Sequence, residues 1–418
     1  MGELYENREE QEQVILVAVE YNDNDDTEAS VDELSELAKT AGAKTLGRLI
    51  QKREAASSAT YIGKGKVEEL RELIEETGAT GIICDDELSP AQMKNLEDAL
   101  DTKVMDRTML ILDIFAGHAS TAEGKLQVEM AQLKYRSSRL VGMRRSMSRV
   151  SYGIGMRGPG EKKLEVDRRL IRDRISRLKD ELDGIEKNRG TNRAKRIESG
   201  TPVAAIVGYT NAGKSTLLNK LTGADILAED MLFATLDPTV RVLKFEDGQE
   251  LLLTDTVGFI RKLPHHLIEA FRSTLEEACF ADIIIHVVDA SDPMAFDQMH
   301  VTYDTLRKLG VKDKPVITLF NKQDKLEERE VLKDLNSDVC IEVSAKTGQG
   351  LDILKQELSK ILLEKKVYIE KVIDFSMAGV LQQIRKSGTL IEEEYVPEGI
   401  AIKAYVDKAL YGRIKDTI

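Results

Sequence analysis

The residues with the clearest chemistry form a glycine-rich segment, Gly208–Ser215, with the pattern G-x-x-x-x-G-K-S. The apolar run Val203–Val207 before it predicts a buried strand, and Thr216–Leu221 after it predicts the start of a helix. The two glycines let backbone N–H groups approach phosphate oxygens, and the new helix adds its positive end. In this context the pattern predicts that Lys214 binds the β- and γ-phosphates of a nucleotide and that the Ser215 hydroxyl binds Mg²⁺.

A second motif, Asp-x-x-Gly, ends the apolar run Leu251–Gly258. The Asp255 carboxylate can hold Mg²⁺ through water, and the Gly258 N–H can contact a γ-phosphate. Each motif follows the carboxyl end of its own predicted strand. In a parallel sheet these ends lie at the same edge, so the two motifs predict one shared site.

A third motif, Asn321–Asp324, follows the strand-like run Pro315–Phe320 and predicts the choice of base. The Asp324 carboxylate can accept hydrogen bonds from N1–H and the exocyclic amine of guanine, a donor pair that adenine lacks. Ser344–Lys346, after another strand-like run, predicts backbone contacts to the base. Four motifs in this order resemble the translation-factor-like branch of P-loop GTPases, which implies a GTPase domain that binds GTP and GDP.

The segment Phe233–Thr239 lies between the first two motifs, where such a domain needs a switch element. Thr235 is expected to complete the Mg²⁺ shell when a γ-phosphate is present, with Thr239 as the alternative. Phe259 follows the Asp-x-x-Gly motif where Ras-like enzymes carry a water-orienting glutamine, so we expect slow basal hydrolysis that a partner stimulates. Asn211 offers another route, because an asparagine there can help to hold K⁺ near the β–γ bridge.

The predicted site has three overlapping sets of residues. The expected catalytic residues are Lys214, Thr235 and Gly258, and the expected Mg²⁺ ligands are Ser215, Thr235 and Asp255. The expected nucleotide contacts are Gly208, Tyr209, Thr210, Asn211, Ala212, Gly213, Lys214, Ser215, Thr216, Phe233, Ala234, Thr235, Leu236, Asp237, Asp255, Thr256, Val257, Gly258, Asn321, Lys322, Gln323, Asp324, Ser344, Ala345 and Lys346.

Composition sets limits on the rest of the chain. The 418 residues suffice for several domains, and 42% of them are hydrophobic. No apolar run reaches transmembrane length and the acidic start does not fit a signal peptide, so we expect a cytoplasmic protein without an integral membrane segment. Cys84, Cys279 and Cys340 are scattered in apolar stretches and are expected to be buried free thiols. The net charge of −13 argues against DNA as a partner.

The first part of the chain alternates strand and helix patterns. Val14–Val19, Leu46–Gln51 and Gly81–Cys84 read as strands, Ser30 is expected to cap a helix, and Ser89-Pro90 opens another. This rhythm predicts a small, mainly parallel sheet with helices.

A helical hairpin is expected next. Two stripes of apolar residues, spaced as on one face of a helix, predict two antiparallel helices: Leu126, Met130, Leu133 and Leu140, then Ile171, Ile175, Leu178, Leu182 and Ile185. The connector 141–160, with four glycines at its end, is expected to be non-helical.

Charge distinguishes this hairpin from an ordinary solvated helix pair. Residues 134–160 hold seven basic and no acidic residues, and 134–196 hold 20 basic and 8 acidic residues. A flexible Arg-rich tip suits irregular RNA, so Arg144, Arg145, Arg149 and Arg157 are expected to contact RNA. The alternatives are a basic loop without a special role and a site for an acidic protein.

The fold class predicted is multidomain α/β. A small α/β domain (1–119) and the hairpin (120–199) precede the GTPase domain (200–365), and a small α+β domain (366–418) follows it. The last domain shows the pattern βαββα, with strands 389–396 and 399–406 about a turn.

Over essentially its whole length the chain resembles the HflX family of ribosome-associated GTPases. The residues that carry the resemblance are Tyr61–Lys66, Leu126–Glu129, Arg157–Glu165, Gly208–Ser215, Phe233–Thr239 and Asp255–Ile260. The resemblance implies binding to the large ribosomal subunit, stimulation of hydrolysis there, and splitting or rescue of stalled or idle ribosomes. Separately, we expect the protein to be a monomer.

Two other classes of function fit the same residues. The chain could be an RNA-remodelling enzyme that uses ATP as well as GTP. It could also be a nucleotide-gated RNA-binding module whose turnover is incidental.

Overall fold

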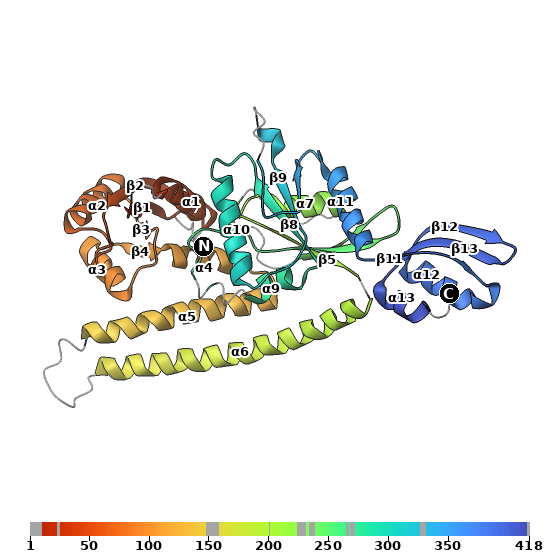
Figure 1. Cartoon of the computed structure of the whole chain (residues 1–418). Helices are drawn as coiled ribbons and strands as arrows, with labels where there is room; N and C mark the ends of the chain where they lie inside the picture. Colours follow the sequence, from red (N-terminus) through yellow and green to blue (C-terminus); the bar gives the residue numbers. More distant parts are fainter. Residues whose placement is uncertain are drawn as a thin grey trace, which may run out of the picture. The chain divides into compact units, whose positions relative to one another are not determined.

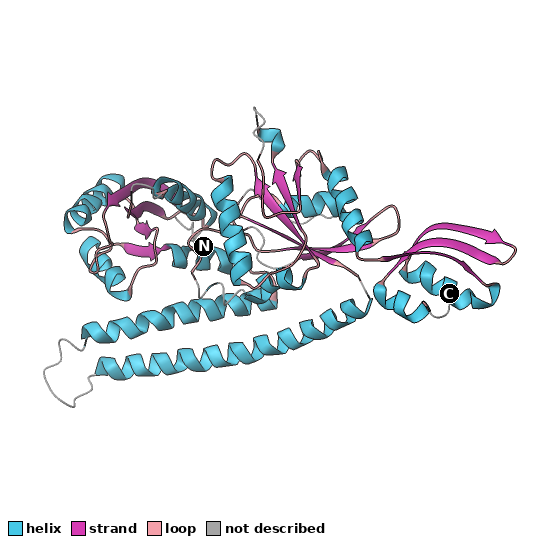
Figure 2. Cartoon of the chain, in the orientation of Figure 1, coloured by secondary structure: helices cyan, strands magenta, loops and turns pink. Residues whose placement is uncertain are grey.

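The structure is a computed structural model, whose helices and strands are shown in Figures 1 and 2. It describes residues 11–22, 26–147, 159–199, 201–223, 231–233, 239–264, 267, 272–326 and 332–415. The chain divides into two compact units. Unit 1 contains 1–188, 229–237 and 260–274, and unit 2 contains 189–228, 238–259 and 275–418. Two short segments from the middle of the GTPase sequence therefore belong to unit 1.

Unit 1 begins with a four-stranded parallel sheet of strand order β2-β1-β3-β4. Its strands are β1 (Gln13–Glu20), β2 (Lys44–Lys52), β3 (Gly81–Cys84) and β4 (Lys103–Asp106), and its helices are α1 (Thr27–Thr40), α2 (Lys64–Thr77), α3 (Pro90–Leu100) and α4 (Arg107–His118). The inner strands β1 and β3 are buried almost throughout, which explains their continuous Val, Ile and Leu runs. The predicted parallel sheet is confirmed.

Two helix starts in this domain test the capping predictions. Ser89 accepts a hydrogen bond from the Gln92 N–H while the Gln92 side chain bonds the Ser89 N–H, and Pro90 occupies the first turn, as expected. The prediction for Ser30 is wrong, because helix α1 begins at Thr27 and Ser30 lies inside it. The Ser30 hydroxyl donates instead to the Asp85 carboxylate at 2.8 Å.

That carboxylate belongs to a buried ionic cluster at the carboxyl end of the sheet. The Arg107 guanidinium, 1% exposed, lies 2.8 Å from Asp85 and 2.6 Å from Glu33. Burial raises the pKa of Asp85, but the attraction of Arg107 and Lys262 outweighs it and holds that pKa below its ordinary value. The carboxylate is therefore charged at neutral pH, and removing its partner leaves an expensive buried charge.

The helical hairpin follows as α5 (Ala122–Met147) and α6 (Pro159–Ser199), which run antiparallel side by side (Figure 1). Unit 1 contains α5 and α6 up to residue 188, and the rest of α6 belongs to unit 2. The Arg174 guanidinium on α6 binds Glu129 on α5 at 2.7 Å and 2.8 Å. Along α6 the predicted stripe is half-buried, with Leu178 fully buried, among mostly exposed neighbours. On α5 Met130 is buried, whereas the rest of the predicted stripe is only half-buried.

The predicted connector 141–160 is too long. Helix α5 continues to Met147, since its last turns are rich in Arg and Met, which favour helices. Helix α6 begins at Pro159, a residue that the first turn of a helix accepts because its missing N–H would have no partner there. Arg149 and Arg157 lie outside the described residues, and no side-chain position is described for Arg144 and Arg145.

One basic residue of the hairpin has a structural role. Arg139 binds Asp106 at 2.5 Å and the Leu88 carbonyl at 3.0 Å, and its guanidinium carbon lies 3.3 Å from the centroid of the Tyr135 ring. It fastens α5 to the end of β4 and is not free for RNA. The local charge excess therefore overstates the charge that the hairpin offers to a partner.

Unit 2 contains a six-stranded sheet of order β10-β9-β8-β5-β7-β6, parallel except for β6. The strands are β5 (Val203–Gly208), β6 (Thr239–Lys244), β7 (Glu250–Asp255), β8 (Ile283–Asp289), β9 (Val316–Asn321) and β10 (Val339–Glu342). Helices α7 (Lys214–Thr222), α9 (Arg272–Phe280), α10 (Ala295–Lys308) and α11 (Leu351–Glu364) and the short η1 (Gln323–Lys325) lie between or after them. The central strand β5 delivers its last residue to the phosphate-binding loop.

The C-terminal part of unit 2 confirms the βαββα prediction. An antiparallel sheet of order β11-β13-β12 is formed by β11 (Val367–Ile373), β12 (Thr389–Val396) and β13 (Gly399–Val406). Helices α12 (Ala378–Ser387) and α13 (Lys408–Ile414), with the turn η2 (Phe375–Met377), contribute Leu381, Leu410 and other residues to one core with the sheet.

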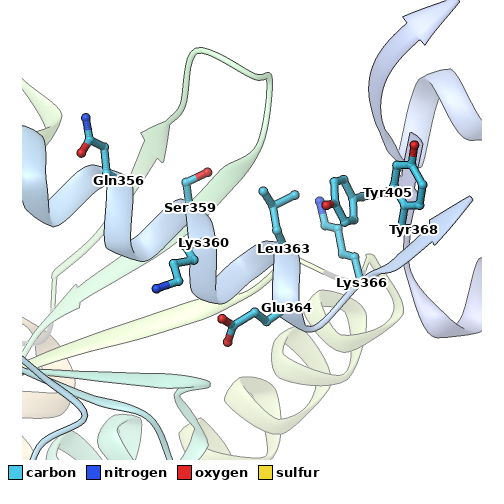
Figure 3. A pocket seen from close by; sticks show the side chains of 8 residues that line it. All are labelled: Gln356, Ser359, Lys360, Leu363, Glu364, Lys366, Tyr368 and Tyr405. Atoms are coloured by element: carbon cyan, nitrogen blue, oxygen red, sulfur yellow. The ribbon is translucent and has the colours of Figure 1, made fainter. Parts of the chain in front are cut away.

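A cleft of about 570 Å³ lies between α11 and this sheet (Figure 3). Lys366 lines it and donates to Gln249 at 3.0 Å and Thr389 at 2.9 Å. Gln249 also donates to Ser359 on α11 at 3.3 Å. These polar contacts tie the first strands of the C-terminal domain to the β6–β7 turn.

Two composition-based predictions meet the structure here. No helix among the described residues is long and apolar enough to cross a membrane. The prediction of three buried thiols is right only for Cys84; Cys279 is half-buried and Cys340 is exposed, since β10 is an edge strand that leaves alternate side chains uncovered.

Replacing Arg107 tests the ionic cluster. We expect Arg107→Ala to lower the free energy of unfolding of unit 1 by about 3–5 kcal/mol, because Asp85 and Glu33 lose a buried partner. Urea unfolding at pH 7, with hydrogen exchange of the β3 and α4 amides, measures the change.

Lys103→Ala is the matched control. Lys103 pairs with Glu12 at 2.5 Å on the same domain, but both side chains are about half-exposed, so its loss should cost less than about 1 kcal/mol. Equal effects of the two substitutions would contradict the importance assigned to the buried cluster.

Candidate functional site

The phosphate-binding loop joins β5 to α7, as the sequence predicts. Gly213 precedes the helix with φ +97°, a left-handed conformation that favours glycine. A Cβ atom on Gly213 would collide with the Asn321 side chain, so the loop also needs glycine for space. The Asn321 amide donates to the Ala212 carbonyl at 2.8 Å, which links the loop to the end of β9.

Lys214 opens α7 and is 6% exposed. Its ammonium donates to the Tyr209 carbonyl at 2.7 Å, within the loop itself. Burial lowers the pKa of Lys214 to about 8; Asp255 opposes this shift and Lys322 adds to it. The negative charge of a polyphosphate would favour the ammonium form, so nucleotide binding and protonation of Lys214 support each other.

Ser215 and Asp255 meet as predicted. The Ser215 hydroxyl donates to Asp255 Oδ2 at 2.7 Å, and Asp255 is fully buried at the end of β7. A hydroxyl and a carboxylate are hard oxygen donors of the kind that Mg²⁺ prefers. These two residues therefore fit a magnesium ion that takes its other ligands from phosphate and water.

The segment after Asp255 is fastened to the phosphate loop by backbone hydrogen bonds. The Phe259 N–H donates to the Gly208 carbonyl at 3.1 Å, and the Thr210 N–H donates to the Phe259 carbonyl at 2.8 Å. The Phe259 side chain is 1% exposed. A buried hydrocarbon ring cannot orient water by hydrogen bonding, in agreement with the expectation from the sequence.

Gly258 is held in close quarters by the same bonds. A Cβ atom there would lie 2.7 Å from Thr210 Cγ2 and 2.9 Å from the Lys214 ammonium nitrogen. The Gly258 backbone thus lies beside the ammonium group expected to bind the γ-phosphate.

The predicted base site is also assembled. The Asn321 side-chain oxygen accepts from the Ala345 N–H at 2.9 Å, and Asp324 accepts from the Ser344 hydroxyl at 2.6 Å. The hydroxyl bond of Ser344 holds the pKa of Asp324 below its ordinary value, so this exposed carboxylate is charged and can accept the two guanine donors.

Asp289 contacts a residue of the predicted base motif, although the sequence reasoning did not include it. Its carboxylate binds Lys322 at 2.7 Å, and it lies beside Asn321 in the β8–β9 register. The available signal was an acidic residue at the carboxyl end of a parallel core strand, where ligand sites of such sheets form.

Several predicted residues lie elsewhere or outside the described residues. Thr235, Ala234, Leu236 and Asp237 are not among the described residues, so their roles stay predictions. Thr239, the alternative to Thr235, starts β6 opposite Asp255. Asn211 is exposed with φ +60°, and Phe233 packs its ring edge-to-face against Phe115 of unit 1 at 4.7 Å.

Gly258→Ala tests the close packing at the phosphate loop. The new methyl group must displace the segment from Thr210 and Lys214, so we expect hydrolysis to fall about a hundredfold, the typical loss when a transition-state donor is misplaced. The affinity for GDP should change little. Single-turnover hydrolysis and titration with a fluorescent GDP analogue measure the two effects.

Gly379→Ala provides the control, since a Cβ at Gly379 on α12 meets nothing within 4 Å. If Gly258→Ala hydrolysed GTP as fast as this control, the Gly258 backbone could not be a contact of the reacting phosphate.

Three family models match consecutive parts of the chain. Residues 28–116 match a model described as GTP-binding GTPase N-terminal, and residues 118–196 match GTP-binding GTPase Middle Region. Residues 203–322 match a model described as 50S ribosome-binding GTPase.

Curated relatives match over most or all of the chain. A protein named GTPase HflX from Lacrimispora saccharolytica is 60% identical over 416 residues, covering 100% of this chain and 98% of the relative. GTPase HflX from Escherichia coli K12 is 43% identical over 354 residues, covering 84% of this chain and 83% of the relative.

Among solved structures, a GTP-binding protein from Sulfolobus solfataricus in complex with GDP is 25% identical, with a TM-score of 0.44, and covers 84% of this chain and 98% of that chain. The Ser215 hydroxyl contacts Asp255, the Asn321 amide binds the glycine-rich loop, and the relatives matched over most or all of the chain carry one name. The chain is therefore a GTPase that belongs to the HflX family.

Proposed function

We propose that this GTPase binds the large ribosomal subunit and splits or rescues stalled or idle ribosomes. The observation that carries the proposal is the match of residues 203–322 to a model of 50S ribosome-binding GTPases. The basic hairpin tip supports an RNA partner, because residues 140–160 contain Arg144, Arg145, Arg149 and Arg157 and no acidic residue. We expect a monomer that acts in the cytoplasm, with domains divided near residues 119, 199 and 365.

The nucleotide site supports a partner-dependent reaction. Lys214 neutralises charge on the β- and γ-phosphates, and the Gly258 N–H contacts the γ-phosphate in the GTP state only. Mg²⁺, held by Ser215 and Asp255 and in the GTP state by Thr235, would add electrostatic stabilisation of the transferring phosphoryl group. At position 259, where Ras-like enzymes carry the glutamine that orients the water, this chain has a buried phenylalanine.

Loss of the γ-phosphate removes the contacts that distinguish the two nucleotide states. We propose that GTP favours the ribosome-binding conformation through Gly258 and Thr235, and that hydrolysis lowers the affinity for the subunit. The large subunit would order the site that lacks its glutamine, which explains how a slow enzyme becomes fast only on its target.

The direct test compares hydrolysis with and without purified large ribosomal subunits. We expect a stimulation of about a hundredfold or more, since ordering the attacking water and the switches is the missing contribution. Alanine at Arg144, Arg145, Arg149 and Arg157 should weaken subunit binding and reduce the stimulation, with basal hydrolysis unchanged. Sedimentation with subunits at physiological salt measures the binding.

The matched control removes four basic residues from α6: Arg169, Arg172, Arg177 and Lys179, all exposed. It lowers the net charge equally, so a tip-specific contact predicts a smaller loss for this variant. Equal losses would indicate non-specific electrostatics, and no stimulation of the parent enzyme would remove the ribosome as its activator.

We further propose that K⁺ assists hydrolysis through Asn211. This side chain is exposed on the phosphate loop, where its oxygen can reach a cation beside the β–γ bridge. Hydrolysis should be about tenfold faster in K⁺ than in Na⁺, and Asn211→Ala should abolish the difference by removing a cation ligand. Equal single-turnover rates in the two salts would refute the role of K⁺.

A further inference from the structure

Lys262 follows Gly258 by four residues and belongs to unit 1, whereas Gly258 belongs to unit 2. Its ammonium binds two neighbouring carboxylates, Asp85 at 2.5 Å and Asp86 at 2.9 Å. Both carboxylates stand at the carboxyl end of β3, which is a rigid element of the parallel sheet. The segment after the γ-phosphate contact is therefore anchored to the N-terminal sheet.

The anchor includes the backbone of the same segment. The buried Arg107 guanidinium donates to the Arg261 carbonyl at 3.3 Å while it binds Asp85 and Glu33. The Arg261 side chain lies 3.7 Å from Asp26. Four charged side chains, those of Asp85, Asp86, Arg107 and Asp26, thus hold two consecutive residues, which is more than a single surface ion pair provides.

The backbone at Lys262 shows that the anchor determines its conformation. Its φ is +53°, a left-handed conformation that is unfavourable for a residue with a side chain. Such conformations persist where the surrounding contacts over-determine them, and they are common in switch regions. Here the ion pairs of Lys262 with Asp85 and Asp86 stabilise its left-handed conformation.

The other end of the segment is fixed by the phosphate loop. Phe259 is bonded through both its N–H and its carbonyl to Gly208 and Thr210. Only two residues separate Phe259 from Lys262, and their Cα atoms are therefore about 11 Å apart at most. Gly258 precedes Phe259 directly, so it lies within four residues of the contact that Lys262 makes in unit 1.

We propose that Lys262 is a positioning residue for GTP hydrolysis: its bonds to Asp85 and Asp86 hold the Gly258–Phe259 backbone in the geometry that the reaction needs. An enzyme whose Phe259 cannot orient water depends strongly on the position of its backbone donors. The N-terminal domain then contributes to the rate without touching the nucleotide.

Phe233, before the predicted threonine ligand, has an anchor in the same unit. It is 3% exposed, has φ +57° and packs against Phe115 of α4. The segment with Phe233 and the segment with Lys262 both belong to unit 1, which supports a common role of this unit for the residues that follow or precede them in the chain.

Loss of the Lys262 side chain leaves no buried charge unpaired. Asp85 keeps Arg107 and the Ser30 hydroxyl, and Asp86 keeps the hydroxyls of Tyr61 at 2.7 Å and Tyr21 at 3.0 Å. Lys262→Ala should therefore fold, which unchanged hydrogen exchange in β3 and α4 would verify. An altered rate can then be assigned to positioning.

The experiment measures single-turnover hydrolysis of GTP by the full chain alone, so its result does not depend on ribosome binding. We expect Lys262→Ala to lower the rate about fivefold or more, because the segment loses its preorganised position. The dissociation constant for GDP should stay within about twofold, since GDP does not contact Gly258. Lys262→Arg, which keeps the charge, should restore most of the rate.

A double-mutant cycle with Asp86→Asn separates this role from a general loss of charge. If Lys262 acts through the aspartates, Asp86→Asn should slow hydrolysis in the parent enzyme and add little in the Lys262→Ala background. Lys103→Ala, which breaks an ion pair elsewhere on the domain, is the control and should leave the rate unchanged. An unchanged or increased rate for Lys262→Ala, or fully additive effects in the cycle, would overturn the proposal.

Discussion

The nucleotide site depends on two backbone hydrogen bonds that join Phe259 to the phosphate-binding loop at Gly208 and Thr210. These bonds hold the Asp-x-x-Gly segment beside the phosphate-binding loop, so that Gly258 lies against Thr210 and the Lys214 ammonium. No side chain fits there, which explains the glycine, and the same bonds bury the Phe259 ring. One short bridge between two loops thus determines which backbone lies beside the Lys214 ammonium and which side chain is buried.

The site contains most of the groups that a phosphate-hydrolysing enzyme uses, but not the side chain that orients the attacking water. A hydrolytic site gains most from groups that are already placed where charge develops, and this site has Lys214, Ser215 and Asp255 in mutual contact or close proximity. What it lacks is a polar side chain for the water, at the position that the buried Phe259 occupies. In the function that we propose, the surface of the large subunit orders the switch segments and supplies this last contribution.

The sequence predicted best where local chemistry has few solutions. Glycine spacing, a buried strand and a following lysine fixed the phosphate loop, and the last two strands were predicted to the residue, 389–396 and 399–406. It failed where the outcome depends on contacts between distant residues. Ser30 was read as a helix cap because serine favours that position, yet its hydroxyl serves Asp85, 55 residues away. Arg139 was included among the seven basic residues of 134–160, but its guanidinium binds Asp106 and stacks on the Tyr135 ring. The spacing of residues in the sequence does not predict contacts between side chains so far apart in the chain.

The ionic cluster around Arg107 is a further case, and its chemistry argues for a role beyond stability. A buried ion pair gains little over well-packed hydrocarbon of the same volume, since desolvation cancels most of the attraction. The buried cluster of Arg107, Asp85 and Glu33 would therefore stabilise the edge of the sheet no better than hydrophobic side chains of the same volume. Lys262 changes that balance, because it is 40% exposed and binds at the rim of the cluster. Its contact can break and re-form in water without exposing a hydrophobic surface, while the buried part stays paired. An ionic rim over a buried, fixed charge is suited to a segment that must be held firmly in one state and released in another.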